Sequence, residues 1–173
     1  MNYLYAPWRS HYINKKASSS KPKGDSQEPC VFCTKLAENN DAQNFILKRF
    51  KHNAIILNLF PYNAGHLMVI PLEHKKRPVE LKTEALQEFM ELTSQSIAIL
   101  EEDLQAEGVN VGLNLGKAAG AGVPGHLHMH VIPRWPGDTN FMPIIAQTKP
   151  ISQDLNLVYQ DLKQLVEKII LSY

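Results

Sequence analysis

The stretch GHLHMHVIPRW, residues 125–135, places three of the chain's seven histidines within five residues. His126, His128 and His130 alternate with apolar residues. In a β-strand successive side chains point to opposite faces, so the three imidazoles would share one face and the apolar residues the other. We expect a strand over 126–133 with its apolar face on a core. The three imidazoles on the other face should have polar partners, because burying them without partners would cost folding free energy.

Short apolar runs and helical spacings elsewhere in the chain predict the rest of the fold. Apolar runs bounded by turn residues predict four more strands, at 45–50, 53–59, 66–71 and 109–116. Apolar residues three and four apart predict a short helix at 34–41, a long helix at 79–107 and a C-terminal helix at 153–171. This order predicts an α+β domain with a mainly antiparallel five-stranded sheet.

Length and composition limit the classes of protein to which the chain can belong. Its 173 residues are 44% hydrophobic and 20% charged, which is typical of a globular domain. The formal net charge of +1 favours neither a nucleic acid nor a membrane as partner. The chain shows no signal peptide and no apolar run long enough to span a bilayer, so we expect a cytoplasmic protein. We divide it into an N-terminal extension with a mobile loop (1–29), the domain (30–145) and the C-terminal helix (146–173).

A glycine-rich loop, KAAGAGVPG at 117–125, leads directly into the histidines. Such loops can turn successive backbone N–H groups toward an anion. A neutral imidazole is a good nucleophile toward phosphorus near pH 7 and can form a covalent nucleotidyl-histidine. A neighbouring histidine can donate a proton to the phosphate or to the leaving group. A lone histidine is usually structural, and two at this spacing often bind metal, but three after such a loop favour catalysis or ligand binding.

The two cysteines, Cys30 and Cys33, form a C-x-x-C motif. In a reducing compartment such a pair is more often half of a metal site or a redox motif than a disulfide. No thioredoxin-like pattern surrounds the pair, and a zinc site would need two further ligands.

The run HLHMHVI resembles the signature of the histidine triad superfamily, which is His-φ-His-φ-His-φ-φ with φ hydrophobic, at all seven positions. NLFPYNAGHLMVIP resembles the family's nucleoside-binding strand pair, and NVGLNLGKAAGAG its phosphate-side strand and loop. The later run PRWPGDTNFMPII and the N-terminal run APWRSHYI are similar to bacterial diadenosine tetraphosphate phosphorylase-type members. The resemblance implies a HIT-like fold.

The resemblance also implies roles for individual residues. His128 takes the position of the nucleophile, and His130 that of the phosphate contact. The implied nucleotide-binding residues are Asn58, His66, Asn114, Gly120, Gly122 and Val123. In some triad proteins and in the related galactose-phosphate uridylyltransferases, a C-x-x-C binds zinc with two histidines. The matching set here is Cys30, Cys33, His74 and His126, which would make zinc structural and give His126 a part in both sites.

The implied activity is cleavage of a dinucleoside polyphosphate such as diadenosine tetraphosphate, by phosphate or by water, through a nucleotidyl-His128 intermediate. Two alternatives remain open: a Hint-like nucleoside phosphoramidase, and a non-catalytic nucleotide- or zinc-binding module. The resemblance further implies adenine nucleotides as ligands, no organic cofactor, and a homodimer formed through the long helix and an edge strand. The helix at 79–107 and the aromatic N-terminus are the surfaces that we expect in this dimer.

Overall fold

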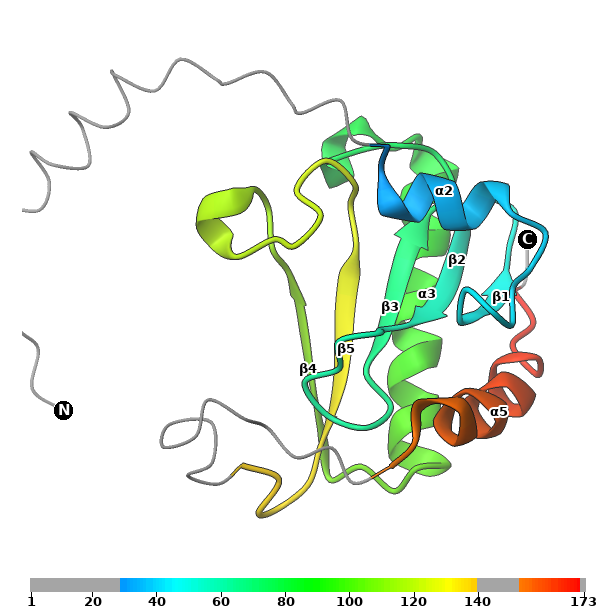
Figure 1. The fold of residues 1–173 in the computed structure, drawn as a ribbon, viewed down its shortest axis with the longest axis vertical. Coiled ribbons are helices and arrows are strands. Elements are labelled where there is room, and N and C mark those ends of the chain that lie inside the picture. Colours follow the sequence, from blue (N-terminus) through cyan, green and yellow to red (C-terminus); the bar gives the residue numbers. More distant parts are fainter. Residues whose placement is uncertain (1–28, 140–152, 172–173) are drawn as a thin grey trace, which may run out of the picture.

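The computed structural model describes residues 29–139 and 153–171, and a single antiparallel sheet forms its centre (Figure 1). The strands, in spatial order, are β1 (Ile46–Arg49), β2 (Asn53–Leu57), β3 (Leu67–Pro71), β5 (Met129–Arg134) and β4 (Gly108–Leu113). Every neighbouring pair is antiparallel. The five-stranded α+β architecture predicted from the sequence is therefore confirmed. No helix within the described ranges is long and apolar enough to cross a membrane.

In the described part of the chain, three α-helices and two 3-10 helices accompany the sheet: α2 (Val31–Ala37), η1 (Pro78–Glu80), α3 (Thr83–Glu102), η2 (Lys117–Ala119) and α5 (Leu155–Val166). The single long helix expected at 79–107 is wrong in its bounds, since Leu81 and Lys82 are extended and separate η1 from α3. At the other end Gln105 has a positive φ of 54°, which a continuing helix does not allow. Gly108, which directly follows the expected helix, is the first residue of β4.

The other bounds also differ from the sequence prediction. The first helix begins at Val31, inside the C-x-x-C motif, rather than at 34. The strand expected at 109–116 ends at Leu113, and Gly116 has a φ of +90°. The strand expected at 126–133 begins only at Met129, because the Leu127 amide donates to Lys75 O and not to a neighbouring strand. Except for Pro29, the predicted extension over 1–29 lies outside the described residues.

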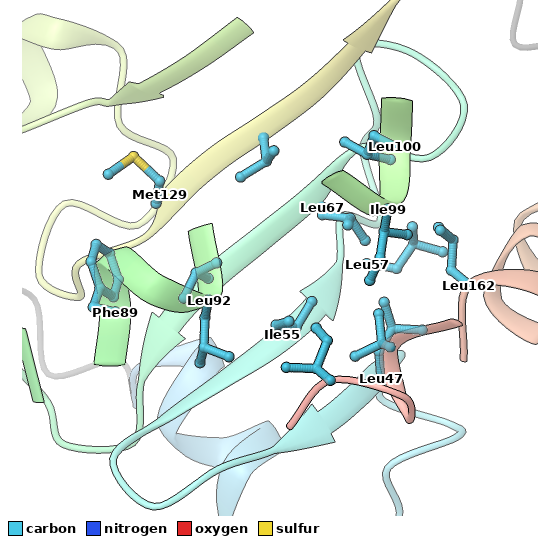
Figure 2. Packing of buried hydrophobic residues seen from close by; sticks show 14 of the residues in the cluster. Leu47, Ile55, Leu57, Leu67, Phe89, Leu92, Ile99, Leu100, Met129 and Leu162 are labelled. Atoms are coloured by element: carbon cyan, nitrogen blue, oxygen red, sulfur yellow. The ribbon is translucent and has the colours of Figure 1, made fainter. Parts of the chain in front are cut away.

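The alternation of side chains gives the sheet two different faces. On one face α3 and α5 cover a core that contains Leu57, Leu67 and Val131 (Figures 1 and 2). On the other face a smaller cluster joins Phe32 of α2 to strand residues such as Ile56 and Met68. Leu127 and Met129 belong to the first core. The predicted separation of apolar and histidine side chains onto two faces is therefore confirmed, although His126, Leu127 and His128 precede β5.

A hydrogen-bonded corner fixes the β2–β3 loop beside β5. Asp138 accepts from Arg134 Nε at 2.6 Å and from Asn63 Nδ2 at 2.6 Å. Asn63 also donates to Pro133 O at 3.0 Å. The Arg134 guanidinium is the main reason that the pKa of the Asp138 carboxyl lies well below its usual range. Gly65, with a φ of +79°, lets the loop approach α3, since a Cβ there would lie 2.9 Å from Leu104 Cδ1.

Candidate functional site

A cavity of about 210 Å³ opens on the α2 face of the sheet. Its walls are largely apolar and include Val31, Phe32, Ile56, Met68 and Phe60. Its polar side chains are Lys35, Asn58, Tyr62, His128 and His130, and Gly120, Gly122 and Val123 line it from the glycine-rich loop. The cavity therefore brings together six of the predicted catalytic and nucleotide-binding residues: Asn58, Gly120, Gly122, Val123, His128 and His130.

The hydrogen bond of His128 defines which of its nitrogens is available. Its ring is 5% exposed, and Nδ1 lies 2.7 Å from the backbone carbonyl of His126. A carbonyl only accepts, so Nδ1 carries the proton and donates it. The neutral ring then has its lone pair on Nε2. His128 is held as the tautomer that a nucleophile requires, in a residue that lines the cavity.

A second chain of hydrogen bonds defines the tautomer of His130. The backbone N–H of Tyr62 donates to His66 Nδ1 at 3.1 Å, so the proton of the neutral His66 ring is on Nε2. His66 Nε2 lies 2.9 Å from His130 Nδ1 and donates to it. Burial, with a smaller contribution from His128, lowers the pKa of His130 to about 4. His130 is therefore neutral at pH 7, with its own proton on Nε2 as a hydrogen-bond donor.

The remaining predicted nucleotide-binding residues lie in different places. Asn58 lines the cavity, approaches His66 Nδ1 with Nδ2 at 3.3 Å and accepts from the Phe60 amide. His66 is fully buried behind His130 and supports that ring rather than lining the cavity. Asn114 is half-buried just after β4 and does not line the cavity. Its role as a phosphate contact remains a prediction.

His126 lies in a separate cluster with Cys30, Cys33 and His74. One ligand atom from each residue lies within 4.8 Å of all the others. Cys30 Sγ is 3.4 Å and Cys33 Sγ 3.5 Å from His126 Nδ1, and Cys33 Sγ is 3.2 Å from His74 Nδ1. The four residues come from α2, the segment after β3 and the segment before β5, so the fold rather than the sequence brings them together.

This donor set fits a structural zinc ion. In a tetrahedral site with usual Zn–S and Zn–N bonds, a sulfur and a nitrogen ligand lie about 3.6 Å apart, close to the separations observed. His126 Nε2 lies 2.9 Å from Pro71 O and donates to it, which leaves Nδ1 with a lone pair toward the two sulfurs. Zinc-binding histidines commonly donate their second N–H to such a carbonyl. The two cysteines are not joined in a disulfide.

Sequence reasoning missed the contribution of α2 to the cavity. Phe32 packs against the rings of both His126 and His128, at centroid distances of 5.4 and 5.3 Å. Lys35 lies three residues further along the same helix and also lines the cavity. A helix that begins at Val31 places residues 32 and 35 on one face, whereas the predicted start at 34 hid this spacing. Tyr62, stacked on His130 at 5.8 Å, was missed as well.

Comparison with known proteins places the chain in a family. Residues 39–137 match the HIT domain model, and the chain therefore belongs to the histidine triad family. It is 37% identical over 150 residues to a protein of Mycobacterium tuberculosis named AP-4-A phosphorylase, covering 87% of this chain and 76% of that one. It is 32% identical to a Schizosaccharomyces pombe bis(5'-nucleosyl)-tetraphosphatase (asymmetrical), over 54% of this chain and 50% of that one.

The solved structures confirm the HIT-like fold. A Zn-bound histidine triad family protein from Mycobacterium smegmatis superposes with a TM-score of 0.62 at 26% identity. The match covers 80% of this chain and 94% of the other.

Proposed function

We propose that this chain cleaves dinucleoside polyphosphates, such as diadenosine tetraphosphate, through a nucleotidyl-His128 intermediate. One observation carries the proposal: two neighbouring imidazoles at one cavity are held in complementary states. His128 has its lone pair on Nε2, and His130 has its proton there. A nucleophile beside a neutral hydrogen-bond donor is what displacement at a phosphate centre requires.

In the first step, Nε2 of His128 attacks the α-phosphorus of the bound nucleotide. A P–N bond forms, and the bond from phosphorus to the bridging oxygen breaks, so that the remaining nucleoside polyphosphate leaves. The His126 carbonyl stabilises the positive charge that develops on His128, because it accepts from Nδ1. His130 Nε2–H donates to an oxygen of the phosphate under attack.

In the second step, an acceptor oxygen attacks the same phosphorus and His128 leaves as a neutral imidazole. Inorganic phosphate as acceptor would convert diadenosine tetraphosphate to ADP and ATP, and water would give AMP and ATP. The names of the two curated relatives contain one activity of each kind. We infer phosphate as the acceptor, because the phosphorylase matches a larger share of the chain.

Zinc held by Cys30, Cys33, His74 and His126 would supply a structural cross-link between α2 and the segment that leads into β5. It would take no part in either displacement. We further propose a homodimer with α3 in the interface, as the family resemblance implies.

The test is incubation of the purified protein with diadenosine tetraphosphate, with and without phosphate, followed by identification of the products. ADP that forms only with phosphate supports phosphorolysis, and AMP in both reactions supports hydrolysis. His128→Ala should fold and lose turnover by at least three orders of magnitude, as for a lost nucleophile. His52→Ala is the matched control, since His52 is half-buried beside another surface pocket. Absence of both turnover and a covalent adduct in the wild type would refute the proposal.

A further inference from the structure

Lys35 is an unusual residue for the wall of this cavity. Among the described residues that line the cavity, it is the one Lys, Arg, Asp or Glu side chain. Its neighbours on the wall include Val31, Ile56 and Met68, which offer a planar apolar ligand little besides contact area. A half-buried ammonium in such a place has lost part of its hydration, so it gains from a ligand that accepts hydrogen bonds.

The ammonium of Lys35 reaches toward β1, whereas His130 lies on β5. Phe32 contacts the His128 ring at 5.3 Å, and Lys35 follows three residues later, about 4.5 Å further along the helix axis. Its Nζ lies 3.3 Å from the backbone carbonyl of Asn44, which precedes β1. His130 is on β5, and two strands separate β5 from β1 in the sheet, a separation of about 14 Å between the outer pair.

This placement assigns Lys35 to the base rather than to the phosphates. A nucleotide whose α-phosphate lies at His128 extends its base along the apolar wall toward Lys35. An ammonium has three N–H donors and no acceptor, and the Asn44 carbonyl occupies one donor. Two donors remain for the edge of the base.

We propose that Lys35 sets the base preference of the cavity in favour of guanine over adenine, so that a guanine-containing dinucleoside polyphosphate would be a better substrate than the diadenosine tetraphosphate that the family resemblance implies. Guanine presents two adjacent acceptors, O6 and N7, which match the two remaining donors. Adenine presents N7 beside an amino group. Because the amino group and the ammonium are both hydrogen-bond donors, they cannot form a hydrogen bond with each other. The inference rests on the proposed function for the orientation of the nucleotide, but base preference can be measured without turnover.

The test compares GMP with AMP binding by calorimetry, and turnover of diguanosine with that of diadenosine tetraphosphate. The wild type should bind GMP about tenfold more tightly, the scale expected for one well-matched base edge. Lys35→Met keeps the length of the side chain and removes the donors, so it should bring the two affinities within about twofold. Lys168→Met removes an exposed cation beyond α5 and should leave the ratio unchanged.

Lys35→Gln provides a second, directional test. An amide donates and accepts, which matches N7 and the amino group of adenine, so the preference should shift toward AMP. An unchanged ratio in both variants would overturn the proposal, as would a wild type that prefers AMP. An equal loss for both nucleotides would instead place Lys35 at the phosphates and also overturn it. Guanine selectivity that disappears in Lys35→Met, in a protein without dinucleotide turnover, would support this inference while refuting the proposed function.

Discussion

His66→Leu should slow the reaction without touching a residue of the cavity wall. His66 is fully buried, and its contacts include a hydrogen bond from the Tyr62 amide to Nδ1 and one from Nε2 to His130 Nδ1. Leucine fills most of the volume but can make neither contact. His130 then loses the partner that keeps its proton on Nε2, and both of its tautomers become accessible.

The magnitude follows from the cost of leaving a buried acceptor without its donor, about 1–3 kcal/mol. If about 2 kcal/mol of this is felt in the transition state, kcat falls roughly 30-fold. His66→Gln is the matched control, because its amide can accept from Tyr62 and donate to His130. We expect it to stay within about threefold of the wild type, or roughly 0.7 kcal/mol.

Single-turnover formation of nucleotidyl-His128 measures the chemical step directly. Nitrogen NMR shifts of His130 report which ring nitrogen is protonated, and a merely structural role for His66 would not change them. We expect protonated Nε2 in the wild type and in His66→Gln, and a mixture in His66→Leu. A folded His66→Leu variant with wild-type rates would refute the reasoning, and so would a glutamine variant as slow as the leucine variant.

Three further predictions concern the metal cluster, the pH dependence and the core. Wild-type protein should contain about one zinc per chain, and Cys30→Ser should lose it, whereas the control Thr34→Ser should not, by elemental analysis. The folded pKa of His130, about 4, is below the unfolded value near 6.5, so stability is complete above pH 6.5 and falls as the pH drops toward 4. His130 should contribute about 1.4 kcal/mol per pH unit to this slope, so the slope should be smaller in His130→Asn; equal slopes would contradict this assignment. Leu92→Ala should cost about 2–5 kcal/mol in denaturant unfolding, because Leu92 is fully buried under the sheet (Figure 2), while the exposed Leu157→Ala should cost far less.

The alternation of histidine and apolar residues from His126 to Val131 was the most informative feature of the sequence for the fold and the candidate site. Because side chains on extended backbone alternate between two faces, the pattern from His126 to Val131 showed both where the core is and where the site is. Leu127 and Val131 indeed lie in the core under α3. The strand start could not be predicted, because it depends on the contact between Leu127 and Lys75, 52 residues apart in the chain.

The polar partners of the histidines were less accessible to sequence reasoning. The family resemblance pointed to Asn58 and His66, but the support that His66 gives to His130 depends on where the Tyr62 amide is directed. Nearly every residue has a backbone N–H group, so the sequence does not show which of these groups will contact a given side chain. Lys35 could not be predicted for another reason. The start of α2 determines which of its residues face the cavity, and α2 begins within the C-x-x-C motif rather than after it.

The backbone around His126 connects the metal cluster to the orientation of the nucleophile. The contacts that hold this segment include those of His126 Nδ1 with both cysteine sulfurs, the hydrogen bond from His126 Nε2 to Pro71 O, and the hydrogen bond from the following amide to Lys75 O. The carbonyl that accepts from His128 Nδ1 belongs to the peptide between the last two of these contacts. Its position is therefore determined by groups outside the cavity, and the tautomer of His128 does not depend on substrate. Under the proposed function, His126 would serve catalysis through its backbone carbonyl while its side chain binds metal, which would explain three histidines for a reaction that uses two imidazoles.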